Sequence, residues 1–292
     1  MAEEIKSRFR RLVSGTGRCM LMAAGVFLGK SGQTEPEPDN RGIFVMDHQW
    51  NGKKIAFLGD SITDAAHIGT TRNYWQFLAE MLDFTPLVFG INGQNWGDIP
   101  SQIGNLQKSG TDADAIIVFA GTNDYNSGCP IGDWWEYRDE TTNANGIICQ
   151  RRRRLPCFDN TTFCGRINVA LDLLKKNYPH RQIIVLTPVH RGFAAFSEEN
   201  IQPEESYPNR LGLYLDTYVD KLKECGDIWS VPVINLYALS GLYPMQKEYA
   251  AYFADAGTDL LHPNIMGHWR IAQTLYYQLK SLPVTDFSAI PQ

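Results

Sequence analysis

From residue 53 onward, short apolar runs alternate along the chain with amphipathic stretches of helical period. All of these runs except the first are rich in Val, Ile or Phe and lack polar alternation, which is typical of strands buried on both faces. The predicted strands are Lys54–Leu58, Pro86–Ile91, Ala115–Ala120, Gln182–Pro188 and Val231–Leu236. The predicted helices lie at about 72–83, 100–108, 162–177, 209–225 and 264–281. This alternation predicts an α/β fold, a five-stranded parallel sheet with helices on both sides, in one domain over residues 43–292.

Composition fits a globular protein with a sizeable core, since 43% of the 292 residues are hydrophobic and 20% are charged. The net charge of −5 provides no general field for attracting nucleic acid, so we expect no nucleic-acid partner. No apolar stretch approaches the ~20 residues needed to cross a bilayer, so we expect no stable membrane insertion of the domain. Oligomeric state does not follow from these features.

The first 42 residues form a separate N-terminal segment. Four basic residues between 6 and 11 precede an apolar stretch at 20–28, whose length suits the core of a signal peptide. Glu3, Glu4 and Arg18, with the lack of a clean Ala-x-Ala cleavage site, favour a cytoplasmic tail instead. A secreted or periplasmic location and a cytoplasmic one therefore both remain open. Residues 31–42 are polar and Pro-rich, as in a linker.

The motif Gly59-Asp60-Ser61 directly follows the first predicted strand. A turn at this point places its hydroxyl at the carboxyl edge of the sheet, where open α/β folds bind ligands. Ser61 is therefore a candidate nucleophile. Gly-Asp-Ser is also ordinary turn chemistry, so the motif needs support from the rest of the chain.

Three further motifs provide that support. Gly90–Gly97 follows the second predicted strand, Gly121–Asp124 follows the third, and Asp259–Pro263 lies near the end of the chain. Ester hydrolysis needs a nucleophile, a base, a group that orients the base, and donors aimed at the developing oxyanion. If all four motifs meet at one edge of the sheet, each of these needs is met.

The residue types suggest how the roles divide. His262 is the expected general base for Ser61, because a neutral imidazole can accept the hydroxyl proton and later return it. Asp259 lies three residues earlier, a spacing that allows its carboxylate to meet the imidazole N–H. Gly93 has no Cβ, so its N–H can approach a substrate oxygen. The Asn123 amide and the Ser61 N–H are expected to complete the oxyanion hole.

Together these four blocks resemble the SGNH/GDSL hydrolases, in the family's order and at similar separations, over about residues 53–282. The resemblance implies a flavodoxin-like three-layer α/β/α fold with strand order 2-1-3-4-5. It also implies hydrolysis of carboxylic esters without a metal or other cofactor. By the resemblance, Ser61, His262 and Asp259 form the triad and Gly93 and Asn123 the oxyanion hole. The remaining motif residues, Asp60, Gly121 and Asp124, are expected to support the site.

The chain departs from the family at two places. Asn92–Asn95 replaces the family's frequent Ser-Gly-Asp-Thr, which makes Gly93 a choice over Gly90 and Gly97. About 37 residues, at 125–161, interrupt the pattern, and a connection this long is uncommon unless it covers a site.

The insertion leaves several interpretations open. Trp134, Trp135 and Tyr137 either form a wall of the substrate site that stacks on sugar rings or close a small core of the insertion. The run Arg151–Arg154 either recognises an anionic substrate group or forms a solvated basic loop. The cysteines of this region either form two disulfides or remain reduced: Cys129, Cys149, Cys157 and Cys164.

The function we expect is a serine-dependent deacetylase or short-chain esterase that acts on carbohydrate or small esters. A lysophospholipase or thioesterase is the alternative within the same chemistry, and a carbohydrate-binding module without turnover is the alternative of another class. No Gly-x-Ser-x-Gly elbow points to an α/β-hydrolase. A metal hydrolase built on His262, His268 and Asp259 is disfavoured, because no His-Glu-x-x-His or comparable cluster accompanies these residues.

Overall fold

A computed structural model describes residues 48–284. The predicted signal or tail segment and the whole linker lie outside these residues. The centre is a parallel sheet with strand order β2-β1-β3-β6-β9. Its strands are β1 (Lys54–Gly59), β2 (Thr85–Val88), β3 (Ala115–Phe119), β6 (Gln182–Leu186) and β9 (Val233–Ile234). The predicted five-stranded sheet and its order are therefore confirmed.

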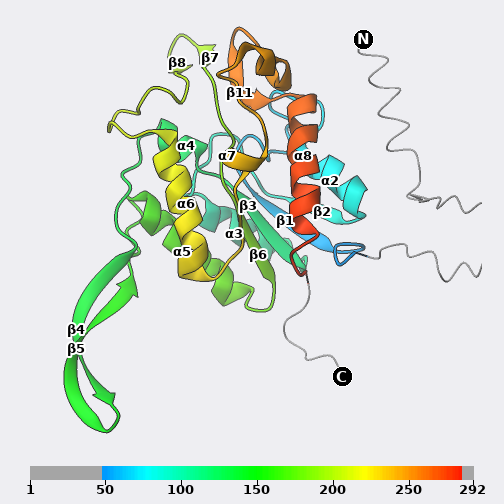
Figure 1. Cartoon of the computed structure of the whole chain (residues 1–292). Helices are drawn as coiled ribbons and strands as arrows, with labels where there is room; N and C mark the ends of the chain where they lie inside the picture. The colour runs from blue at the N-terminus through cyan, green and yellow to red at the C-terminus, as the bar shows by residue number, and fades with distance from the viewer. Residues whose placement is uncertain (1–47, 285–292) are drawn as a thin grey trace, which may run out of the picture.

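Helices cover both faces of this sheet and make three layers (Figure 1). On one face α3 (Ile99–Lys108), α5 (Phe163–Asn177) and α6 (Leu215–Trp229) pack around Trp96 and the even-numbered residues of β3. On the other face α2 (Tyr74–Leu82) and α8 (Ile265–Leu279) pack together against Phe57 and Phe119. All five residues of β3 and of β6 are buried, which explains their lack of polar alternation.

Two predicted elements are shorter in the structure, and in both places an asparagine side chain accepts hydrogen bonds from the backbone. The helix expected from residue 209 begins only at Leu215, because the Asn209 Oδ1 accepts from the Leu211 and Leu213 N–H groups and holds a turn there. The strand expected over Val231–Leu236 shortens to two residues. Asn235 then caps the short helix α7 (Leu236–Leu239).

A second, antiparallel sheet that the sequence analysis did not predict lies beyond the carboxyl edge of the first. Its order is β10-β11-β7-β8. The strands are β10 (Phe253–Asp255), β11 (Asp259–Pro263), β7 (Ala194–Ser197) and β8 (Asn200–Gln202). The 3₁₀ helix η2 (Lys247–Tyr252) directly precedes β10, and α4 (Thr122–Asn126) follows β3. This sheet carries the predicted base, His262.

The insertion folds into a long β-hairpin, which we call the arm: β4 (Trp135–Ala144) and β5 (Ile147–Pro156), paired from end to end. Asn145 and Gly146 join the strands, both with positive φ (54° and 83°), as a type I′ turn requires. The Asn-Gly pair was thus a hairpin signal that the sequence analysis missed. The arm extends away from the end of the molecule that holds β7, β8 and β11 (Figure 1).

The cysteines of the described residues are free thiols: Cys129, Cys149, Cys157, Cys164 and Cys225. Burial raises the pKa of Cys129 to about 11 and that of Cys164 to about 12. In residues 48–284 the disulfide alternative therefore has no structural support. No helix in this part of the chain has the length and apolarity needed to span a membrane.

Candidate active site

The turn after β1 presents Ser61 at the sheet edge. The Asp60 carbonyl accepts from the N–H groups of Thr63 and Asp64, both at 3.0 Å, while the Asp60 Oδ1 accepts from the Ile62 N–H at 3.1 Å. A Cβ on Gly59 would lie 2.3 Å from the Phe119 carbonyl oxygen, so only glycine allows β1 and β3 to approach here. The turn is therefore fixed by its own backbone and by the neighbouring strand.

Ser61, His262 and Asp259 form a continuous chain of hydrogen bonds. The Ser61 Oγ lies 3.0 Å from the His262 Nε2, and the His262 Nδ1 lies 2.8 Å from the Asp259 Oδ2. The other carboxylate oxygen of Asp259 accepts from the backbone N–H groups of Leu261 and His262, at 3.1 and 2.9 Å. These bonds orient the carboxylate locally, within β11. Ser61 and His262 are each 4% exposed, so the pair is largely shielded from water.

Two residues that the sequence analysis did not select touch His262. A Cβ on Gly69, where φ is +71°, would lie 2.7 Å from the His262 Cβ. The Phe196 ring on β7 lies 5.3 Å from the imidazole, between ring centres, and its side chain is exposed. Gly69 thus lets the loop after β1 close against the imidazole, and Phe196 forms an apolar rim beside it.

Asn123 contacts the loop that follows β2 and contains Gly93. The Asn123 Nδ2 donates to the Gln94 carbonyl at 2.8 Å, which leaves its second N–H for another acceptor. Gly93 has φ +78°, and an added Cβ would meet no atom within 4 Å. A Cβ on Gly90, in contrast, would lie 2.7 Å from the Thr63 side chain. Gly93 is thus the glycine of this loop whose backbone faces open space.

The same loop lies beside the Ser61 turn. The Ile91 N–H donates to the Gly59 carbonyl at 3.1 Å, and the Asn92 N–H donates to the Asp64 Oδ2 at 2.7 Å. Within the described residues, neither the Ser61 N–H nor the Gly93 N–H has a hydrogen-bond acceptor. The N–H groups of Ser61 and Gly93, and the second N–H of the Asn123 amide, are therefore free to donate to a ligand.

Gly121 and Asp124 hold the short helix α4 that carries Asn123. Gly121 has φ +132° at the helix N-cap, a conformation that L side chains rarely adopt. Asp124 is fully buried, and its carboxylate accepts from the Trp96 N–H at 3.0 Å and from the Arg166 Nη1 at 2.9 Å. Burial raises the pKa of Asp124 to about 6. Asp124 thereby ties α4 to the loop that contains Gly93.

Gln102 on α3 connects the nucleophile turn to the same loop. Its Oε1 accepts from the Gly59 N–H at 2.8 Å, and its Nε2 donates to the Gly59 carbonyl at 2.7 Å and to the Gln94 Oε1 at 2.6 Å. The side chain is fully buried. Sequence reasoning missed Gln102, because a single glutamine in a helical pattern gives no signal of such a role.

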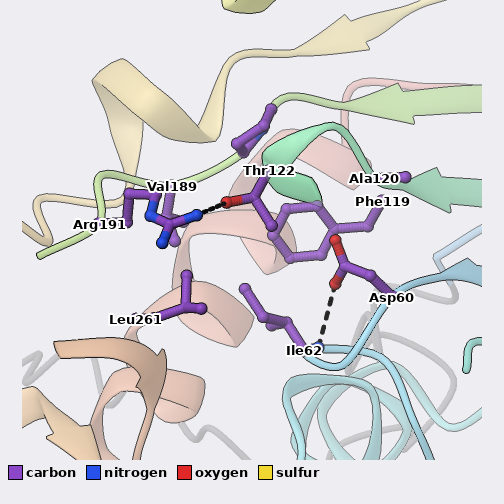
Figure 2. Close-up of a pocket in the computed structure, with 9 residues that line it drawn as sticks. Asp60, Ile62, Phe119, Ala120, Thr122, Val189, Arg191 and Leu261 are labelled. Atoms are coloured by element: carbon purple, nitrogen blue, oxygen red, sulfur yellow. Dashed lines mark hydrogen bonds between the residues drawn. The ribbon is translucent and has the colours of Figure 1, made fainter. Parts of the chain in front are cut away.

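Arg191 is a buried cation that lines a small pocket together with Asp60 and Thr122 (Figure 2). It donates to the Thr122 Oγ1 at 3.2 Å and to the Gln202 Oε1 at 2.7 Å. Arg191 and Asp60 both line a small pocket of about 10 Å³, which is the size of about one water molecule. Burial raises the pKa of Asp60 to about 7 and lowers that of Arg191 to about 10. Burial thus opposes ionisation of both groups, while the Asp60 charge raises the pKa of Arg191.

His268 does not join the other candidates for a metal site. It is fully buried, its ring stacks on Tyr74, and its Nδ1 accepts from the Tyr74 N–H at 3.1 Å. Burial lowers the pKa of His268 to about 3, so its ring is neutral at ordinary pH. His262, in contrast, contacts Asp259 and Ser61, so the three residues do not converge on one point.

Of the two interpretations of Trp134, Trp135 and Tyr137, the structure gives no support to a wall of the substrate site. Trp134 is buried in the core beside α5 and α6, where its Nε1 donates to the Glu224 Oε2 at 2.7 Å. Trp135 and Tyr137 lie on β4, in the arm, which extends away from β11, the strand that carries His262 (Figure 1). The insertion leaves the body beside α5 and α6, whose packing directs it away from the sheet edge.

Comparison with known proteins agrees with this geometry. Residues 57–270 match the model of the GDSL-like Lipase/Acylhydrolase family. The chain belongs to this family. The family's members are esterases and acylhydrolases, so the protein is a hydrolase that acts on ester bonds. The resemblance inferred from the four sequence blocks is confirmed.

Solved structures show the same fold. A protein from Lactobacillus plantarum is 29% identical over 79% of this chain and 98% of its own, with a TM-score of 0.60. A possible lipase from Chitinophaga pinensis is 22% identical over 80% of this chain and 100% of its own, with a TM-score of 0.59. None of the curated proteins matches this GDSL-like chain.

Proposed function

We propose that this GDSL-like acylhydrolase is a serine esterase in which Ser61 is the nucleophile, His262 the general base and Asp259 the residue that orients the base. The observation that carries the proposal is the hydrogen-bonded chain from Ser61 through His262 to Asp259, at 3.0 and 2.8 Å. Because the Asp259 carboxylate accepts a hydrogen bond at the His262 Nδ1, the tautomer with the proton on Nδ1 is favoured. In this tautomer the lone pair of the Nε2 faces the Ser61 hydroxyl.

The chemistry follows from this arrangement. His262 accepts the hydroxyl proton as the Ser61 Oγ attacks the ester carbonyl, and the negative charge that develops on the carbonyl oxygen is stabilised by N–H donors. We assign these donors to Ser61, Gly93 and Asn123. His262 then returns the proton to the departing alcohol. In the second half, His262 takes a proton from water as the water oxygen attacks the acyl carbon. The bond from this carbon to the Ser61 Oγ then breaks, His262 returns the proton to the Ser61 Oγ, and the acid is released.

For the substrate we propose a short acyl ester, above all an acetyl ester, of a sugar or another small hydrophilic alcohol. A cleft of about 320 Å³ lies between α4 and β8. Asn126 contributes to it, one helical turn beyond Asn123, so the cleft begins close to the proposed oxyanion hole. Three polar side chains of the cleft can form hydrogen bonds with the hydroxyl groups of a sugar: Glu199, Asn200 and Arg210. Three apolar residues of the cleft can contact the face of a sugar ring: Ile201, Pro203 and Pro208.

The test is hydrolysis of p-nitrophenyl esters from acetyl to dodecanoyl, together with release of acetate from acetylated oligosaccharides. We expect the highest kcat/KM with acetyl esters, and Ser61→Ala should lower kcat by about 10⁴-fold or more. Preference for long acyl chains would instead support a lysophospholipase or thioesterase. Glycan binding without hydrolysis of any ester would support the binding module.

A further inference from the structure

The arm is a two-stranded hairpin that projects from the body (Figure 1). Each strand has ten residues and therefore extends about 33 Å. Its base is fixed: the Asn168 Nδ2 donates to the carbonyls of Trp134 and Cys157, at 2.9 and 2.8 Å. From Glu136 to Leu155, the side-chain hydrogen bonds in the structure stay within the hairpin.

The arm lacks the packing against a third strand or a helix that normally stabilises a β-hairpin. An isolated two-stranded hairpin is marginal in water, and here both strand edges expose unpaired backbone groups. At the tip, Ile147 and Ile148 are each 68% exposed, and Tyr137 is 52% exposed nearer the base. The side chains of this surface are suited to packing against something outside the chain's own fold.

Charge indicates what that partner is. The arm carries five arginines against three carboxylates, whereas the whole chain has a net charge of −5. Arg138 and Arg153 are paired with Glu136 and Glu140.

In the part of the chain that the structure describes, three arm arginines have no ion pair with a carboxylate: Arg151, Arg152 and Arg154. The guanidinium of Arg152 lies 4.9 Å from the centre of the Tyr137 ring, and that of Arg154 lies 4.1 Å from the Trp135 ring. These contacts place two guanidinium groups on one face of the arm, where they can interact with an acidic protein surface.

We propose that the arm docks on the body of a second copy of this chain, reciprocally, in a two-fold symmetric dimer. The body, without the arm, is the more acidic part of the chain and so complements the arm's charge. In a two-fold symmetric dimer each copy's arm is covered by the body of the other copy, so no arm is left exposed and the assembly is closed. Two arms about 33 Å long and about 10 Å wide would bury on the order of 1,300 Å² in total, above the ~1,000 Å² of a specific interface.

A polyanion could also form ion pairs with the arginines of the arm. It would not, however, cover the apolar side chains at the tip. A protein surface can do both, because interfaces combine an apolar centre with a charged rim. The second copy therefore accounts for Ile147, Ile148 and the arginines together, whereas a polyanion accounts for the arginines alone.

The experiment is the molar mass of the full chain by size-exclusion chromatography with light scattering, from about 1 to about 100 μM. We expect twice the chain mass of 33.0 kDa at the higher concentrations. In a shortened variant, Asn-Gly replaces residues 138–153, so that Tyr137 and Arg154, which are paired in the intact arm, flank a new two-residue turn. This variant should be monomeric throughout, as should Ile147→Ser with Ile148→Ser.

Leu211→Ser with Leu239→Ser is the matched control, since both leucines are exposed (42% and 47%) but lie outside the arm. This control should dimerise like the unaltered chain. A monomeric unaltered chain at 100 μM, or a shortened variant that still dimerises, would overturn the proposal. Hydrolysis of p-nitrophenyl acetate, measured on the same samples, should not change in the shortened variant, because the arm lies away from His262. Loss of dimerisation is thus separable from any failure of the proposed esterase activity.

Discussion

Gly69 lies directly against His262: a Cβ at Gly69 would be 2.7 Å from the Cβ of the imidazole side chain. Real side chains essentially never make so close a contact, so any residue other than glycine must displace either the loop or the histidine. Because proton transfer depends on the position of the imidazole, this glycine is linked to catalysis without touching the substrate.

Gly69→Ala is therefore expected to lower kcat/KM on p-nitrophenyl acetate by about 10²-fold, since a displacement of about 1 Å can cost that much. Gly52→Ala is the matched control, because Gly52 has a similar φ of +70° but no atom within 4 Å of an added Cβ. Both variants should lose about 1 kcal/mol of stability from the positive φ. If the two variants have equal activity, the contact with His262 has no catalytic role.

Asp259→Asn should lower kcat by on the order of 10⁴-fold. Asparagine retains an oxygen that can accept from the Leu261 and His262 N–H groups, so β11 should keep its geometry. Its amide, however, cannot accept the Nδ1 proton of His262, which favours the wrong tautomer. Kinetics and circular dichroism of the variant check this. A fall of less than tenfold would mean that another group orients His262.

Asn123→Ala should lower kcat by about 10²–10³-fold with little change in KM, as expected for the loss of one oxyanion donor. Ser127→Ala is its control, because Ser127 directly follows α4, is exposed and does not line the proposed substrate cleft. That variant should retain kcat on p-nitrophenyl acetate. Equal losses in both variants would indicate damage to α4 rather than a lost donor.

Asp60 should make stability depend on pH. Burial raises its pKa to about 7 in the folded state, from the ordinary value of 3.8. Between about pH 4 and 7 the folded state therefore binds more protons than the unfolded state, so this residue lowers the free energy of unfolding as pH rises. The charge of His262 lowers the pKa of Asp60 and that of Asp124 raises it, while the Asp60 charge raises the pKa of Arg191.

Asp60→Asn removes this titration and keeps an oxygen for the Ile62 N–H. Relative to the unaltered protein, its free energy of unfolding should rise between pH 5 and pH 8, as measured by urea denaturation at each pH. A difference that is constant over this range would place the Asp60 pKa outside it.

Much of the fold followed from local sequence pattern. Strands such as Ala115–Phe119 and Gln182–Leu186 are buried on both faces, so their composition alone identifies them. The Asp259–His262 pair was also predictable, because its geometry is made within one strand. The arm was not recognised, although Asn145-Gly146 is a local hairpin signal.

Only the tertiary structure decided which residues surround this local machinery. Ser61 and His262 are 201 positions apart, and they meet because β11 joins a small second sheet at the carboxyl edge of the first. Gly69, Gln102 and Arg191 take their places through contacts with distant segments, which leave no periodic trace in the sequence. The sequence by itself determined the parallel sheet and the candidate groups, since burial and turns are local. How those groups are packed, and where the arm points, depends on contacts between distant residues.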